Sequence, residues 1–202
     1  MNDEYNVSII LFPDFETLDA FGPIEILGKH PSLHVTCYSQ NGGLIYSAQN
    51  IATYTLSFDA IPDNSIILIP GGKGTRSLVN DLDFLRALDN LCHNADYCLT
   101  VCTGSALLAR TPHLNGRFAT SNKKSFAWVR SQNESVQWQS SARWTVDGKY
   151  YTSSGVSAGI DMALGFISDK FGRKYTEYIA HHIEYHWNDN PYMDAFAFKE
   201  ND

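Results

Sequence analysis

Tyr97-Cys98-Leu99-Thr100-Val101-Cys102-Thr103-Gly104-Ser105-Ala106-Leu107-Leu108-Ala109 is the stretch that decides the fold. Its first residues predict a short strand, Thr103-Gly104 predicts a sharp turn, and the Ala- and Leu-rich end predicts a helix. The Cys102 thiol is therefore expected at a helix N-terminus, where free N–H groups and the helix dipole favour an anion. Because the thiolate is the nucleophilic form of cysteine, the stretch indicates a reactive Cys102. From these residues alone, a buried core thiol remains the alternative.

Two apolar runs elsewhere are typical of strands buried on both faces of a parallel sheet. They cover residues 6–12, ended by Pro13, and residues 65–69, followed by Pro70-Gly71-Gly72-Lys73-Gly74. The glycines after the second run allow backbone N–H groups to approach a ligand closely. The Gly-Lys-Ser/Thr ending of a phosphate loop is missing there, so this turn does not indicate a nucleotide.

The rest of the chain alternates between helical and extended patterns. Helices are expected over residues 17–29, 81–95, 125–132 and 155–171 and from about residue 174, and further strands over 34–39, 44–46, 51–56, 142–146 and 150–153. This alternation predicts an α/β sandwich with a mostly parallel sheet. Ligands bind beyond the C-terminal strand ends of such a sheet, which brings residues 13–19, Gly71-Gly72 and Cys102 together.

Composition limits the class of protein and its partners. The 202 residues are 44% hydrophobic and 18% charged, which suits one globular domain over residues 1–202. A net charge of −7 and a pI near 5.4 argue against a nucleic-acid or anionic membrane partner. The start, Met1-Asn2-Asp3-Glu4, is acidic and unlike a signal peptide, and no apolar run could span a membrane. We therefore expect a cytoplasmic protein whose four cysteines are reduced.

Four stretches together carry a resemblance to a known family. They are residues 17–25 (TLDAFGPIE), 69–72 (IPGG), 101–109 (VCTGSALLA) and 154–164 (SGVSAGIDMAL). In this order they resemble the DJ-1/PfpI (ThiJ) superfamily, and within it the branch that contains isocyanide hydratase. The resemblance implies a flavodoxin-like three-layer sandwich of the class I glutamine amidotransferase type, and often a homodimer.

The same resemblance implies roles for individual residues. Cys102 would be the nucleophile on a sharp elbow, and Asp19 the acidic residue that hydrogen-bonds it. The Gly72 amide would be an oxyanion-type donor, and the remaining substrate- or oxyanion-binding positions would be Gly71, Gly155 and Val156.

Three departures from relatives narrow the function. Thr103 stands where protease-like members have a His, and residues 157–159 lack the His-x-Glu of glutamine amidotransferases. An intracellular protease or amidase is therefore disfavoured. Ser121-Asn122-Lys123 replaces the Thr-His-Trp of many close relatives, which leaves the substrate open.

The preferred hypothesis is a small-molecule enzyme without a cofactor. The Cys102 thiolate would attack an isocyanide carbon, Asp19 would manage a proton, and backbone amides with the Thr103 hydroxyl would orient substrate and water. A DJ-1-like glyoxalase acting on small aldehydes is one alternative. Another is a redox sensor, in which a Cys102 sulfinate is stabilised by Asp19. A structural reading of Asp19, as a carboxylate at a helix start, also stays open.

The C-terminal residues carry two further patterns. His181, His182 and His186 lie near one helical face, but no His-Glu-x-x-His signature is present and no metal is expected. The aromatic tail, from Tyr185 through Tyr192 to Phe196-Ala197-Phe198, is expected to form either a lid or a dimer contact.

Overall fold

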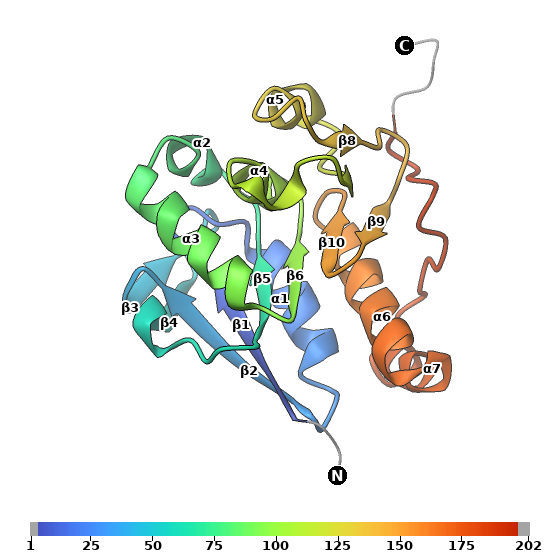
Figure 1. Cartoon of the computed structure of the whole chain (residues 1–202). Helices are drawn as coiled ribbons and strands as arrows, with labels where there is room; N and C mark the ends of the chain where they lie inside the picture. Colours follow the sequence, from blue (N-terminus) through green and yellow to red (C-terminus); the bar gives the residue numbers. More distant parts are fainter. Residues whose placement is uncertain (1–3, 198–202) are drawn as a thin grey trace.

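An eight-stranded sheet forms the centre of the molecule in the computed structural model, which describes residues 4–197. Its strand order is β3-β4-β2-β1-β5-β6-β10-β9 (Figure 1). The strands are β1 Tyr5–Ile10, β2 Leu33–Ser39, β3 Asn41–Tyr46, β4 Ala52–Ser57, β5 Ile66–Ile69, β6 Tyr97–Thr100, β9 Trp144–Asp147 and β10 Tyr150–Ser153. All neighbouring pairs are parallel except the two at the edges, β3 with β4 and β9 with β10. The predicted mostly parallel sheet is confirmed.

Helices cover both faces of this sheet (Figure 1). The chain moves from β1 to β2 in one direction and from β5 to β6 in the other, so right-handed crossovers place their helices on opposite faces. Helix α1 (Thr17–Leu27) packs with α6 (Ala158–Phe171), while α3 (Leu82–Asn94) lies on the other face. The remaining helices are α2 Thr75–Leu78, α4 Gly104–Ala109, α5 Phe126–Arg130 and α7 Arg173–His182, with short 3₁₀ turns at Phe58–Ala60 and Pro112–Leu114.

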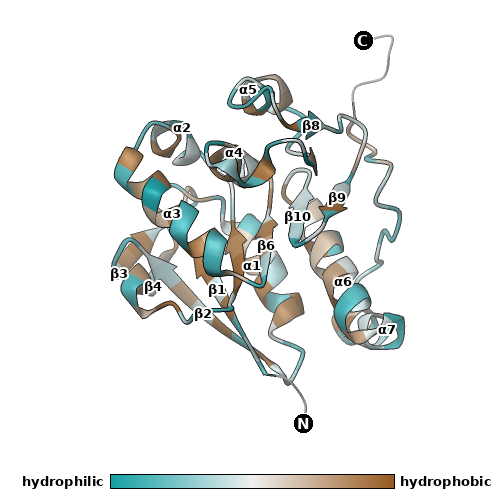
Figure 2. Ribbon diagram, in the orientation of Figure 1, coloured by the Kyte–Doolittle hydropathy of each residue, from teal (hydrophilic) through white to brown (hydrophobic). Residues whose placement is uncertain are grey.

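The central strands form the core. Every residue of β5 is buried, as are Val7, Ile9 and Ile10 of β1, and Figure 2 shows these strands as the apolar centre of the molecule. Strands covered by helices on both faces lose their apolar surface to solvent on both sides. This explains why the sequence shows them as continuous apolar runs rather than alternating ones.

Three local expectations were wrong. Gly22-Pro23 predicts an interruption of the first turns of the 17–29 helix, but α1 continues through both residues, which are buried, and Gly22 packs directly against Ile160 of α6. Helix α6 begins at Ala158 rather than residue 155, because Val156 has a positive φ of 36° that no helix accommodates. Asn41-Gly42-Gly43 predicts a turn before the 44–46 strand, but the segment belongs to strand β3, where Gly42 and Gly43 have positive φ.

Other elements had no clear sequence signal. A two-stranded sheet pairs β7 (Phe118–Ala119) with β8 (Gln137–Trp138), and helix α2 has only four residues. These elements of two to four residues cannot show a hydrophobic period, so the sequence does not predict them.

Within residues 4–197, no helix is long and apolar enough to cross a membrane. The acidic start at residues 1–3 and the aromatic residue Phe198 lie outside the described residues.

Candidate functional site

Cys102 occupies a strained turn between β6 and α4. Its φ of 57° lies in the left-handed region, which non-glycine residues rarely adopt. The Cys102 N–H donates to Ser154 O at 3.1 Å, and the Cys102 carbonyl accepts from Ser121 Oγ at 2.7 Å and Ser105 Oγ at 3.1 Å. Three elements of the chain thus hold the strained residue in place.

Gly104 permits this turn. A Cβ at position 104 would collide with the Ile69 carbonyl oxygen and lie 2.8 Å from the Pro70 carbonyl oxygen. Only glycine allows the start of α4 to pass this close to the end of β5. The sharp turn expected from the sequence therefore also brings the start of α4 close to the end of β5.

Asp19 brings a fully buried carboxyl group from the first turn of α1 to the thiol. Its Oδ2 accepts the Gly71 N–H at 3.0 Å. Its Oδ1 is buried and has no hydrogen-bond partner among the described residues, while the Cys102 thiol interacts with the carboxyl group and lowers its pKa. One carboxylate oxygen is therefore held by the backbone, and the other is buried without a partner.

The electrostatics of this pair depend mainly on burial. Burial and the charge of Glu16 raise the pKa of Asp19 to about 7, while the Gly71 N–H and the Cys102 thiol oppose the rise. The pKa of Cys102 is also raised, first by burial and then by the Asp19 charge; the N–H groups of Thr103 and Val156 act in the opposite direction. As pH rises through about 7, the pair thus loses one of its two protons and then holds one proton and one negative charge between the two groups.

The expectation that a helix N-terminus alone makes Cys102 a thiolate is therefore corrected. Helix α4 has only six residues, and Cys102 is 7% exposed. The loss of hydration and the nearby carboxylate outweigh the backbone amides. These effects favour the protonated thiol, and Asp19 is the nearby group to which its proton can move.

The Gly71-Gly72 turn packs against Thr103. The Gly72 N–H donates to Thr103 Oγ1 at 3.0 Å, and Thr75 Oγ1 lies 3.1 Å from the same oxygen. A Cβ on Gly71 would lie 2.6 Å from Thr103 N, so this contact excludes a side chain. The Gly72 amide and the Thr103 hydroxyl, expected to face substrate, thus bind each other.

The loop of residues 154–157 supplies the other side of the site. Val156 has a φ of 36°, which is strained for a β-branched residue, and its N–H acts on the Cys102 sulfur. The donors that face the sulfur are thus the Thr103 and Val156 amides. Val156 was among the expected oxyanion positions, whereas the Thr103 backbone amide was not assigned that role.

A cavity of about 700 Å³ opens next to this loop. It is lined by Asn122, Lys123, Lys124, Ser154, Gly155, Val156, Ser157 and Phe196. A Cβ on Gly155 would collide with Asn122 Nδ2, so the Asn122 amide occupies the space above this glycine. The Ser121-Asn122-Lys123 departure in the sequence therefore lies on the wall of the cavity.

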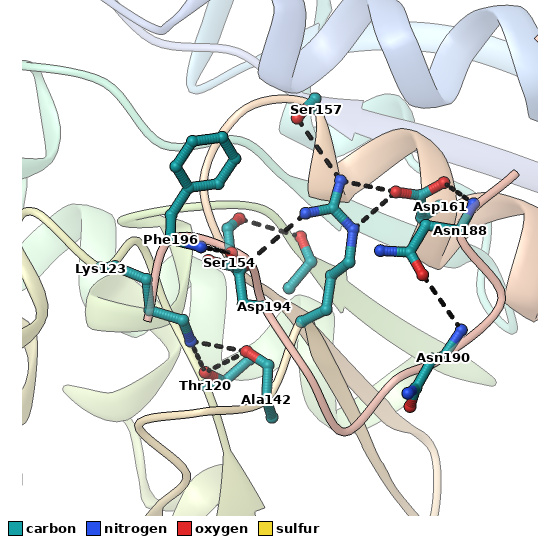
Figure 3. Close-up of polar contacts among 12 residues, drawn as sticks. Thr120, Lys123, Ala142, Ser154, Ser157, Asp161, Asn188, Asn190, Asp194 and Phe196 are labelled. Carbon is teal, nitrogen blue, oxygen red and sulfur yellow. Dashed lines mark hydrogen bonds and ion pairs between the residues drawn. The ribbon is translucent and has the colours of Figure 1, made fainter. Parts of the chain in front are cut away.

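Lys123 contributes its stem, rather than its amine, to this wall. Its Nζ donates to Ala142 O at 2.6 Å and to Thr120 Oγ1 at 2.9 Å, and Figure 3 shows it pointing away from Phe196. Burial lowers the pKa of Lys123 to about 8, and the charge of Asp194 opposes this change.

Metal ligation has no visible candidate in the part of the chain that the structure describes. Residues 4–197 contain no group of three His, Cys, Asp or Glu side chains that could hold an ion. His181 and His182 end helix α7. The four cysteines are free thiols.

Known proteins share this sequence pattern and fold. A model of the DJ-1/PfpI family matches residues 5–169. Isonitrile hydratase from Pseudomonas putida is 28% identical over 183 residues, which are 89% of this chain and 78% of the relative. The crystal structure of a THiJ/PfpI family protein from Pseudomonas syringae is 24% identical, with a TM-score of 0.80, and the match covers 97% of this chain and 80% of that one. Drosophila melanogaster DJ-1beta has a TM-score of 0.75 at 17% identity, over 91% of this chain and 100% of that one.

Proposed function

Because the chain belongs to the DJ-1/PfpI family, we propose that its Cys102 site hydrates an isocyanide to an N-substituted formamide without a cofactor. The observation that carries the proposal is the buried pair of Cys102 and Asp19, which lies beside the 154–157 loop that lines a cavity. Hydration of an isocyanide needs a nucleophile and a proton donor at the same carbon. The similarity to isonitrile hydratase supports this choice of substrate class.

The first half of the reaction uses the shared proton. When that proton lies on Asp19, the Cys102 sulfur is an anion held by the Thr103 and Val156 amides. The sulfur attacks the terminal isocyanide carbon while Asp19 delivers the proton to the same carbon. The product is a thioimidate, in which a C–S and a C–H bond have formed and Asp19 is a carboxylate.

The second half consumes water. The water oxygen bonds to the thioimidate carbon while Asp19 accepts a proton from that water. Asp19 then passes this proton to the thioimidate nitrogen. The tetrahedral intermediate then expels the sulfur, and its hydroxyl proton returns to the Cys102–Asp19 pair. The formamide leaves and the free enzyme is restored, so one water is consumed for each isocyanide.

The test follows loss of a simple alkyl isocyanide and an aryl isocyanide, and formation of each formamide. We expect turnover by the wild-type protein, none by Cys102→Ser, and normal turnover by the matched control Cys37→Ala in β2. Absence of turnover in the wild-type protein would overturn the hydratase. Conversion of methylglyoxal would then support the aldehyde enzyme, and peroxide oxidation of Cys102 without turnover would support the sensor.

We also propose that the chain forms a homodimer. Four large apolar side chains on one face of the β3–β4 hairpin are exposed: Leu44, Tyr46, Tyr54 and Leu56. Such a patch is unusual on the surface of a monomer. Sedimentation equilibrium should give twice the chain mass for the wild-type protein and less for Tyr54→Lys, whereas a monomeric wild-type protein would contradict this.

A cytoplasmic location accompanies the proposed chemistry. All four cysteines are free, and a reactive thiol is preserved in a reducing compartment. Fractionation of the source cells would test it, with recovery in the cytoplasmic fraction expected.

A further inference from the structure

Arg143 is a buried cation that joins four parts of the chain. It directly precedes β9, and its side chain is 8% exposed. Its Nε and Nη2 both lie 2.6 Å from Asp161 Oδ2 in the first turn of α6. Its Nη1 lies 3.7 Å from Asp194 Oδ2, and the backbone N–H of Arg143 donates to Pro191 O at 2.8 Å. Two carboxylates from different segments therefore compensate one buried guanidinium.

Asp161 also holds the C-terminal segment, defined here as residues 183–197. Its Oδ1 accepts from the Tyr185 hydroxyl at 3.2 Å and the Asn188 N–H at 3.0 Å, and its carbonyl accepts from Trp187 Nε1 at 3.1 Å. Figure 3 shows Asp161, Asn188 and Asp194 gathered in this cluster. The aromatic tail is thus fastened to its own chain through residues 185–194.

A short path of hydrogen bonds connects Arg143 with the catalytic cysteine. The Arg143 carbonyl accepts the Ser154 N–H at 2.8 Å, and the Ser154 carbonyl accepts the Cys102 N–H at 3.1 Å. Arg143 Nη2 also reaches Ser157 Oγ at 3.5 Å. Arg143 therefore contacts both ends of the 154–157 loop, whose middle residue Val156 is strained.

A strained backbone persists only when its surroundings hold it in place. The 154–157 loop has two anchors in Arg143, one at Ser154 and one at Ser157 with the adjoining turn of α6. The C-terminal segment closes the other side of Arg143 and ends at Phe196 on the cavity wall. Loosening this segment would leave the guanidinium with one carboxylate instead of two.

We propose that Arg143 is a positioning residue, which holds the 154–157 loop so that the Val156 N–H faces the Cys102 sulfur. The C-terminal segment supports the loop through its contacts with Arg143. The inference rests on the proposed function only for Cys102 as the nucleophile. The Val156 amide would stabilise the anionic sulfur and the charge that develops on attack, where one backbone donor is worth about 100-fold in rate.

The experiment measures hydrogen exchange of the Val156 amide by NMR in the full-length protein, together with kcat and KM for isocyanide hydration. The variants are Arg143→Met, Arg143→Lys and Asp194→Asn. Arg173→Met is the matched control, because Arg173 binds Asp189 of the same C-terminal segment at 2.8 Å but is exposed and does not contact the loop. Amides of β1 report on opening of the whole molecule.

We expect Val156 exchange at least about tenfold faster in Arg143→Met, with unchanged exchange in β1. The kcat should fall by about 100-fold with a smaller change in KM. Arg143→Lys should recover part of both effects, Asp194→Asn should show a smaller change in the same direction, and Arg173→Met should match the wild-type protein.

Unchanged Val156 exchange in Arg143→Met and Asp194→Asn would overturn the proposal, and so would faster exchange with an unchanged kcat. Should Arg143→Met fail to fold, Asp194→Asn and Arg143→Lys decide in its place. If Val156 exchange accelerates as expected but even the wild-type protein hydrates no isocyanide, the positioning role stands and the proposed function fails.

Discussion

Two buried side chains, the carboxyl group of Asp19 and the thiol of Cys102, form the centre of the candidate site. Asp19 is fully buried and Cys102 nearly so. Burial raises the pKa of both groups, and the Asp19 charge raises the pKa of Cys102 further, whereas the Cys102 thiol lowers the pKa of Asp19. A carboxyl group and a thiol that share one proton can supply both the acid and the nucleophile of the proposed hydration. At the scale of the residue, the proposed chemistry therefore depends on the pair and not on a free thiolate.

The pH dependence of Cys102 alkylation tests this pair. With iodoacetamide and mass spectrometry, we expect the wild-type rate to rise through about pH 7, where the pair loses its first proton. In Asp19→Asn the midpoint should move to alkaline pH, because burial still raises the pKa of the thiol. Glu16→Gln should move the midpoint to lower pH, since the Glu16 charge raises the pKa of Asp19. Identical midpoints in all three proteins would refute the shared proton.

At the scale of the element, one strand–turn–helix unit depends on a glycine for reasons of space. Gly104 brings the start of α4 against the carbonyl oxygens at the end of β5. Gly43 in β3 is different, because it has a positive φ of 92° but no atom within 4 Å of an added Cβ. A Cβ added at position 104 would meet a steric contact, whereas a Cβ added at position 43 would meet only an unfavourable backbone conformation.

Gly104→Ala should therefore lower the free energy of unfolding by about 3 kcal/mol, the upper range for overpacking. Gly43→Ala should cost about 1 kcal/mol, the usual penalty for placing a residue with a Cβ at positive φ. Urea unfolding at pH 7 measures both values. Equal losses would show that close approach of α4 and β5 is not what requires glycine at position 104.

The connection between β7 and α5 contributes the Asn122 side chain to the cavity wall. Asn122 lines the cavity; its Oδ1 accepts the Ser125 N–H at 2.9 Å, while its Nδ2 has no acceptor among the described residues. For the proposed isocyanide reaction, Asn122→Ala should raise KM about fivefold with little change in kcat, as expected for one neutral hydrogen bond. Gln137→Ala in β8 is the control, and an unchanged KM in Asn122→Ala would exclude this contact.

At the scale of the whole molecule, the site is built at some expense to stability. The folded state raises the pKa of Asp19 from 3.8 to about 7, so between these values it binds more protons than the unfolded chain. Stability from this group is therefore greatest at low pH and falls as pH rises through about 4 to 7. Enzymes commonly accept such a cost where a buried ionisable group is needed for activity.

Asp19→Asn should consequently be more stable than the wild-type protein at pH 7.5, and the difference should vanish near pH 4. The rise in pKa corresponds to an upper limit of about 4 kcal/mol at 1.36 kcal/mol per pKa unit. Urea unfolding across this pH range measures the difference, with the exposed Asp59→Asn as control. If the free energies of unfolding of the wild-type protein and Asp19→Asn changed with pH in parallel, burial of the Asp19 carboxylate would not be destabilising.

Much of the fold and part of the site could be read from local sequence. Continuous apolar runs identify β1 and β5 because both faces of these strands are covered, and the order of strands and helices follows from the alternation of patterns. Parallel strands place their C-terminal ends at one edge, which predicts that Asp19, Gly71 and Cys102 lie close together. The hydrogen bond from the Gly71 N–H to Asp19 confirms that two of these residues meet.

The amino-acid sequence by itself thus determined the class of fold and the place of the thiol, because both depend on short-range periodicity and on turn residues such as Gly104. Only the tertiary structure decided how Cys102 ionises, because desolvation depends on atoms from α1, β5 and the 154–157 loop together. It also decided that the Gly72 amide binds Thr103, and that Arg143 gathers Asp161 and Asp194. These partners lie far apart along the chain. A local sequence pattern cannot predict a contact that forms only when the chain has folded.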